Sequence, residues 1–301
     1  MVKRTLYFGN STYLSLKNKQ LKIDLIDSDR TVLTIPIEDI GIVVLDNYQI
    51  TITSGVIESL LENNVSIITC DKSHLPVGLM LTLFGNTVQS ERFRYQIDAS
   101  IPLKKQLWQQ TVISKINNQG DVLEIQKGLS PKNMRVWANN VKSGDVENKE
   151  ARAAAYYWKT LFPEIEYFTR DREGVFPNNL LNYGYAILRA IVARALVSNG
   201  LLPTLGIFHR NKYNAYCLAD DIMEPYRPYV DKLILDIMDN YDSYNVINKE
   251  IKSKLLSIPT IDVVINNKRS PLMVAVSTTS ASLMKCYTGE TRKILYPSIL
   301  T

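Results

Sequence analysis

Two carboxylates and an imidazole, in three separate segments, are the side chains best suited to catalysis in this sequence: Glu150, His209 and Glu224. His209 is one of only 2 histidines, and it lies in residues 206–211, a stretch without helical periodicity. Such a set can bind a divalent ion, Mg²⁺ or Mn²⁺, and leave positions for water and a phosphate oxygen. These residue types therefore point to phosphodiester chemistry.

A further acid, Asp221, lies three residues before Glu224, so on a helix both would project from one face and could address one ion. Glu150 stands near the start of an alanine-rich segment, where small side chains would let a ligand approach the carboxylate. A cation held there would stabilise negative charge on a phosphate in the transition state. The ordinary alternative stays open, because helical acids are more often surface charges or caps, and a lone histidine more often a hydrogen-bonding residue.

Several basic side chains near these segments are candidates for holding nucleic acid by its phosphates. They are Arg210, Lys212, Arg227, Arg170 and Arg172. The pair that follows His209 stands out because it adjoins the candidate metal ligand. The other histidine, His74, lies beside a proline turn with no second ligand at metal spacing, and we leave it out of the site.

Length and composition set the frame for these candidates. With 301 residues and 46% hydrophobic content, the chain is long enough for two domains, each with its own core. A net charge of +5 is compatible with nucleic acid but does not decide for it. The 3 cysteines lack the spacing of a zinc site or a disulfide framework. Apolar runs are short or interrupted by Arg189 and Arg194, and no signal peptide appears, so we expect a cytoplasmic protein without a membrane segment.

The first part of the chain alternates with the period of strands. Residues 13–16, 21–25 and 31–35 predict short antiparallel strands, and the pattern continues at 40–45 and 49–53. A short helix over 54–61 and a buried strand over 65–70 complete the segment. We therefore predict an N-terminal β domain over residues 1–84.

The pattern then changes to the period of helices. Residues 85–98 read as a partly helical linker, and 99–301 as a mainly α-helical domain that carries the catalytic and DNA-binding residues. One predicted helix of this domain begins near residue 102. Five more cover 147–161, 178–199, 218–223, 229–239 and 271–286. The fold class is α+β.

Three ordered motifs carry a resemblance to a known family. They are NYGYA at 182–186, GLLPTLGIFH at 200–209 and LADDIMEPYRP at 218–228. The chain resembles the CRISPR-associated endonucleases that act as integrases in spacer acquisition, the first protein of the adaptation module. The opening strand, the alanine-rich helix after Glu150 and the late YTGE at 287–290 extend the resemblance over nearly the whole chain.

The resemblance implies an N-terminal β-sandwich and a C-terminal helical domain. It implies Mg²⁺ or Mn²⁺ bound by Glu150, His209 and Glu224, with Asp221 less certain as a ligand. Asp220 departs from the family pattern, which leaves open which of the three neighbouring acids faces the metal. We expect a homodimer, formed through the β domain, together with a small ferredoxin-like CRISPR-associated partner; effector-system proteins are further candidate partners.

The activity that the resemblance implies is insertion of a short DNA duplex, the prespacer, into the CRISPR repeat by attack of its 3′-hydroxyl ends. Two other functions fit the residues. One is a nuclease whose nucleophile is always water. The other is a non-catalytic DNA-binding scaffold in which the acids are caps and salt-bridge partners.

Overall fold

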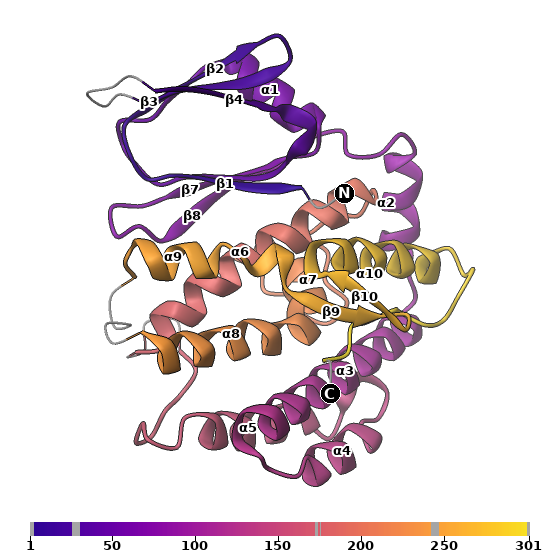
Figure 1. Cartoon of the computed structure of the whole chain (residues 1–301). Coiled ribbons are helices and arrows are strands. Elements are labelled where there is room, and N and C mark those ends of the chain that lie inside the picture. Colours follow the sequence, from indigo (N-terminus) through magenta and orange to yellow (C-terminus); the bar gives the residue numbers. More distant parts are fainter. Residues whose placement is uncertain (1–2, 26–30, 172–173, 175, 242–246, 300–301) are drawn as a thin grey trace. The chain divides into compact units, whose positions relative to one another are not determined.

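The chain divides into two compact units, Met1–Gln89 and Ser90–Thr301. The structure is a computed structural model, and it describes residues 3–25, 31–171, 174, 176–241 and 247–299. Strands make up most of the first unit and helices most of the second (Figure 1). The predicted α+β class, with strands first and helices after, is confirmed.

The first unit contains two four-stranded sheets, which form two facing layers in Figure 1. One sheet has the order β1-β5-β7-β8 and the other β4-β3-β2-β6. The elements are β1 (Arg4–Phe8), β2 (Thr12–Lys17), β3 (Gln20–Leu25), β4 (Val32–Pro36), the 3₁₀ turn η1 (Ile37–Asp39), β5 (Ile40–Leu45), β6 (Thr51–Ile52), α1 (Ser54–Glu62), β7 (Ser66–Cys70) and β8 (Pro76–Met80).

The strand pairing follows the sequence only in part. β2, β3 and β4 are antiparallel neighbours, as their alternation predicts. β5, which we expected to continue this pattern, instead lies parallel between β1 and β7. The reason is its apolar run IGIVVL, almost wholly buried, which suits an inner strand covered on both faces and not a half-exposed meander.

A single apolar core joins the two sheets of this unit. It takes Leu14 and Leu21 from one sheet, Val43 and Ile67 from the other, and Leu60 from α1, all nearly inaccessible to solvent. α1 contributes because its apolar residues recur on one helical face. The first unit therefore has a core of its own.

The second unit contains the remaining elements: α2 (Gln89–Ile97), α3 (Ile101–Lys127), α4 (Lys132–Asn139), η2 (Ser143–Asp145), α5 (Lys149–Leu161), α6 (Asn178–Ser198), α7 (Cys217–Met223), η3 (Glu224–Tyr226), α8 (Arg227–Asn240), α9 (Lys249–Leu255), η4 (Ile258–Thr260), β9 (Asp262–Ile265), β10 (Lys268–Pro271) and α10 (Leu272–Tyr287). All six helices predicted for this part are present. The short helices α4 and α9 and the antiparallel hairpin β9-β10 were not predicted.

The long helix α3 is the frame of the second unit, and it contacts α4, α5, η3 and α8 (Figure 1). Its ends follow from local chemistry. The Ser100 hydroxyl accepts a hydrogen bond from the Leu103 N–H at 3.3 Å, an N-cap, and Pro102 stands in the first turn. At the other end Gly128 adopts φ 64°, the left-handed conformation that stops a helix.

The other central helix, α6, is buried on nearly all sides. Its length and composition would suffice to cross a membrane, but 78% of its apolar stretch is buried in the structure. It packs against α7, α8 and α10. Burial by these three helices accounts for the all-round apolar character of α6.

Candidate active site

Three different elements of the second unit carry the predicted site residues. Glu150 lies in the first turn of α5, His209 in the loop between α6 and α7, and Glu224 at η3, where α7 passes into α8. The start of α5 is fixed by Asp145, whose carboxylate accepts the main-chain N–H of Glu150 at 3.0 Å. The position of the Glu150 backbone therefore depends on a cap outside its own helix.

The loop that carries His209 is folded around the buried carboxylate of Asp221. Asp221 accepts the main-chain N–H of Phe208 at 2.9 Å and lies 2.5 Å from Nδ1 of the His209 ring. Gly206 is required for this turn: a Cβ atom there would lie 2.3 Å from the carbonyl oxygen of His209 and 2.8 Å from Oδ2 of Asp221. The glycine permits the loop to close over the acid.

A lysine that the sequence interpretation overlooked lies between the two glutamates. Nζ of Lys115, from α3, donates a hydrogen bond to Oε1 of Glu150 at 2.6 Å and lies 2.6 Å from Oε2 of Glu224. The Lys115 side chain is 12% exposed. Burial alone would lower the pKa of Lys115, but Glu224 and Glu150 outweigh it and raise that pKa above its usual value. One ammonium group thus joins the two carboxylates.

Arg227 gives Glu224 a second positive neighbour, with its Nε 2.9 Å from Oε1. Burial opposes ionisation of Glu224, but Arg227 and Lys115 outweigh that effect and hold its pKa below the usual value. The hydrogen bond with Asp221 raises the pKa of His209, and the charges of Glu224 and Glu150 act in the same direction. The charges of both glutamates thus favour the protonated form of the imidazole.

The three neighbouring acids of α7 and η3 have different partners. Asp220 pairs with Arg189 at 2.7 Å and accepts a hydrogen bond from Asn214. Asp221 is occupied by His209 and the backbone of its loop. Of these three acids, Glu224 is the one whose carboxylate contacts Lys115, the residue that also binds Glu150. The three acids therefore differ in their contacts, and Asp221 is the one bound to Nδ1 of the His209 imidazole.

The donor chemistry of Glu150, His209 and Glu224 suits a hard divalent cation. Oε2 of Glu224 is buried and faces the ammonium of Lys115 at 2.6 Å. Because Asp221 engages Nδ1 of His209, Nε2 is the nitrogen left for a ligand. Over the described ranges no three His, Cys, Asp or Glu side chains form a ready-made metal cluster. Lys115 stands where the glutamates would meet a cation.

An aromatic wall stands beside His209. The ring of Trp108, on α3, stacks on Phe208 with centroids 4.3 Å apart, and His209 meets Trp108 edge-on at 5.6 Å. A cavity of about 190 Å³ adjoins this wall and is lined in part by three basic side chains, Lys104, Lys105 and Arg210. The exposed Arg210 is the predicted nucleic-acid contact that faces a cavity.

The other basic candidates lie in different surroundings. Lys212 is exposed, with its ammonium 4.8 Å from the centre of the Tyr213 ring. Arg170 and Arg227 both lie over the ring of Tyr185, at 5.0 and 4.6 Å. Arg170 also donates to two asparagine side chains, and Arg227 pairs with Glu224, so both guanidinium groups have partners inside the unit. Arg172 lies outside the described residues.

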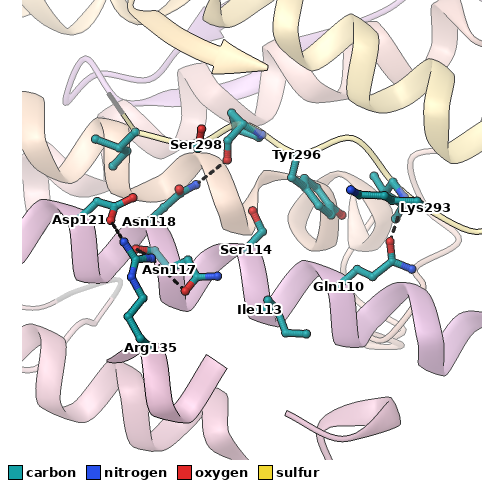
Figure 2. Close-up of a pocket in the computed structure, with 13 residues that line it drawn as sticks. Gln110, Ile113, Ser114, Asn117, Asn118, Asp121, Arg135, Lys293, Tyr296 and Ser298 are labelled. Carbon is teal, nitrogen blue, oxygen red and sulfur yellow. Dashed lines mark hydrogen bonds and ion pairs between the residues drawn. The ribbon is translucent and has the colours of Figure 1, made fainter. Parts of the chain in front are cut away.

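A second stretch of α3 lines a larger cavity, of about 540 Å³, together with Arg135 of α4 and residues 293, 294 and 296–299 (Figure 2). Asn118 lies there, pointing toward the C-terminal segment in Figure 2. Its amide nitrogen donates to the carbonyl oxygens of Pro225, at 2.7 Å, and Pro297, at 3.1 Å. Asn118 therefore ties the turn that carries Glu224 to the C-terminal segment.

Spacing in α3 was a signal for Lys115 and Asn118 that the sequence interpretation did not use. Trp108, Thr111, Lys115 and Asn118 follow one another at three or four residues, so they share one helical face. Trp108 and Thr111 are buried on that face. A lysine in line with buried residues is a candidate for an internal partner.

Comparisons with known proteins agree with the three motifs of the second unit. A family model described as CRISPR associated protein Cas1 matches residues 6–246. The CRISPR-associated endonuclease Cas1 of Neisseria meningitidis serogroup C (strain 8013) is 36% identical over 302 residues, which cover 100% of this chain and 97% of that protein.

Solved structures share the fold. A casposase bound to integration product matches with a TM-score of 0.80 at 19% identity, over 98% of this chain and 92% of that one. A Cas6-RT-Cas1--Cas2 complex matches with a TM-score of 0.72 at 20% identity, over 97% of this chain and 36% of that one. The family resemblance of the sequence is confirmed, and the chain belongs to the Cas1 family of CRISPR-associated proteins.

Proposed function

We propose that this chain is a metal-dependent DNA endonuclease and integrase of CRISPR adaptation, which joins the 3′ ends of a short duplex to a CRISPR repeat. The observation that carries the proposal is the meeting of Glu150 and Glu224 on one cation, Lys115. Residues from three separate elements converge there. A set of unrelated caps and surface charges would not be expected to do so.

The names of its relatives support the same activity. The Neisseria relative is called an endonuclease, and the casposase is described as bound to an integration product. A further relative stands in a complex with Cas2. We infer from these names that the substrate is DNA and that the chain works with a small CRISPR-associated partner. The homodimer is an expectation from the family resemblance alone.

Glu150, His209 and Glu224 would hold the divalent ion, Mg²⁺ or Mn²⁺, through two carboxylates and Nε2 of the imidazole. When bound, the ion would stabilise negative charge on the scissile phosphate and favour ionisation of the attacking hydroxyl. Asp221 would orient His209 from behind, as second partners of metal-bound histidines commonly do. Nothing here requires Asp221 to touch the ion.

The remaining residues fit the handling of a polyanion. Lys104, Lys105 and Arg210 line the 190 Å³ cavity beside His209, where they can neutralise phosphates without reading sequence. The half-exposed Phe208 offers an aromatic face that a base can stack on. Arg227, one side of which pairs with Glu224, supplies positive charge close to the phosphate that reacts.

The reaction is a transesterification without redox change. The 3′-hydroxyl oxygen of the incoming strand forms a bond to the repeat phosphorus while the P–O3′ bond of the repeat strand breaks. The attacking hydroxyl loses its proton to water, and the departing 3′ oxygen takes one up. Holding the two oxygens in line with the phosphorus is the contribution expected of the protein.

The test is a joining assay with the purified chain, its small CRISPR-associated partner, Mn²⁺, a duplex with free 3′-hydroxyls and a target that carries the repeat. We expect branched joined products, and none from the His209→Ala variant, which should still fold and bind the duplex. Products of cleavage alone would establish the water-dependent nuclease. Joining unaffected by His209→Ala would remove the proposed site, and absence of any Mn²⁺ binding would favour the DNA-binding scaffold.

A further inference from the structure

We propose that Lys115 is the resident counter-ion of the catalytic site, an internal ammonium group that a divalent ion displaces when it binds. The inference rests on the proposed metal site at Glu150, His209 and Glu224, and adds to it a residue and an exchange of cations. Its basis is position: Nζ lies 2.6 Å from one oxygen of each glutamate, where a shared metal ion would have to be.

The two carboxylate oxygens of Glu224 have separate partners, so the exchange of cations concerns only one of them. Oε1 faces Arg227 at 2.9 Å, and Oε2 faces Lys115 at 2.6 Å. The contact of Oε2 with the Lys115 ammonium is charge-assisted, and it compensates the negative charge on that buried oxygen. A divalent ion that takes the place of Lys115 at Oε2 would leave the pair with Arg227 in place.

The backbone of α3 is anchored on both sides of the lysine. Three residues C-terminal to Lys115, Asn118 is hydrogen-bonded to Pro225 and Pro297, and four residues N-terminal to it, the Thr111 hydroxyl lies 2.7 Å from that of Tyr296. These contacts hold the helix, and they leave the long side chain of Lys115 free to rotate. The exchange therefore needs rotation about side-chain bonds and no rearrangement of helices.

An opening for this rotation exists. The Lys115 side chain is 12% exposed, the Glu150 side chain 20% and the His209 side chain 43%. The ammonium group can thus reach water beside the glutamates, where it is best solvated. In the absence of a divalent ion it returns, because two carboxylates this close, one of them buried, repel each other without a cation.

The test is binding of Mn²⁺ to the full-length chain, measured by calorimetry at fixed ionic strength. Lys115→Met removes the competing charge, so we expect it to bind Mn²⁺ at least about tenfold more tightly than the unaltered chain. In EDTA the same variant should unfold on the order of 5 to 10 °C lower, because the glutamates lose their common partner, and Mn²⁺ should restore it. Lys232→Met is the matched control, since among the described residues that half-exposed lysine of α8 forms an ion pair with Asp236 alone, at 3.9 Å.

Binding of Mn²⁺ that is abolished by His209→Ala but unchanged, within about twofold, by Lys115→Met would overturn the exchange and leave the metal site standing. Binding that is indifferent to His209→Ala would overturn both. If Lys115→Met does not fold, Lys115→Gln gives the same test. It keeps a donor for Glu150 without the charge, and it must also tighten Mn²⁺ binding for the exchange to hold.

Discussion

His209 is held by Asp221 through its ring and its main chain together. Nδ1 lies 2.5 Å from Oδ1 of the acid, and the main-chain N–H of His209 approaches the same oxygen at 3.3 Å. The buried carboxylate accepts from the ring, so it favours the tautomer with the proton on Nδ1 and leaves Nε2 as the acceptor. The direction of the imidazole is thus fixed by a fully buried residue.

Replacing Asp221 with asparagine should lower Mn²⁺ affinity and the rate of joining by roughly 10- to 100-fold. The amide has no negative charge and only one acceptor oxygen, so it cannot accept from both the Phe208 N–H and the His209 ring. Metal titration and the joining assay measure the two effects. Asp220→Asn is the control, since the neighbouring acid pairs with Arg189 and Asn214 and should leave Mn²⁺ affinity nearly unchanged. Equal losses in both variants would contradict the assignment of the orienting role to Asp221.

The loop that presents His209 depends on a glycine. Gly206→Ala would place a methyl group 2.3 Å from the carbonyl oxygen of His209, a backbone atom that cannot give way without opening the turn. We expect the free energy of unfolding to fall by about 1–3 kcal/mol and joining to fall with it, as urea unfolding and the joining assay would show.

Gly55→Ala, in α1, is the matched substitution, because a Cβ atom there meets nothing within 4 Å. It should be neutral, or should stabilise the protein by up to about 1 kcal/mol, since alanine is the better helix former. A tolerated Gly206→Ala variant with full activity would show that the turn can relax.

Stability should depend on pH through a buried acid of α8. Burial raises the pKa of Asp231 to about 7, although the hydroxyls of Tyr185 and Tyr157 donate to it at 2.5 and 3.0 Å. The folded chain then keeps a proton that the unfolded chain releases from about pH 4 upwards. The contribution of Asp231 to the free energy of unfolding is therefore largest in acid. It falls by up to roughly 4 kcal/mol as the pH rises toward 7, and it stays constant at higher pH.

Denaturant unfolding at pH 5 and pH 8 measures this slope. Asp231→Asn cannot ionise, so its stability should change less between the two pH values than that of the unaltered chain. Asp236→Asn, which changes an acid of α8 whose side chain is 47% exposed, should keep the original slope. An Asp231→Asn profile that parallels the unaltered one would assign the slope to other groups.

The sequence predicted the helical unit well because its main helices carry long apolar faces and recognisable ends. The sequence-based prediction failed for short elements, and for strands whose pairing partners lie far away in the sequence. The hairpin β9-β10 turns through Asn266 and Asn267, both with positive φ, a signal that was present but unused. The parallel place of β5 could not be predicted from alternation, because its neighbours β1 and β7 lie far from it in sequence.

For the site, the sequence indicated the candidate ligands but not the charges between them. Residue type and motif single out Glu150 and His209, whereas Lys115 looks like any helical lysine until the fold brings α3 between the glutamates. The same holds for the acids. Spacing allowed both Asp220 and Asp221 beside Glu224, and only their partners, Arg189 and His209, distinguish them.

The link between the C-terminal segment and the turn of Glu224 gives the last prediction. Asn118→Ala removes the amide donor that the carbonyl oxygens of Pro225 and Pro297 share. Asn118 is buried, so each carbonyl oxygen would lose this hydrogen bond in the interior of the unit. The free energy of unfolding should fall by about 1–3 kcal/mol, and joining should slow because the carboxylate next to Pro225 loses its support. Asn240→Ala is the control, since that exposed amide donates to the Asp236 carbonyl of its own helix and to no other group among the described residues. Loss of stability without any change in joining would confine Asn118 to holding the C-terminal segment.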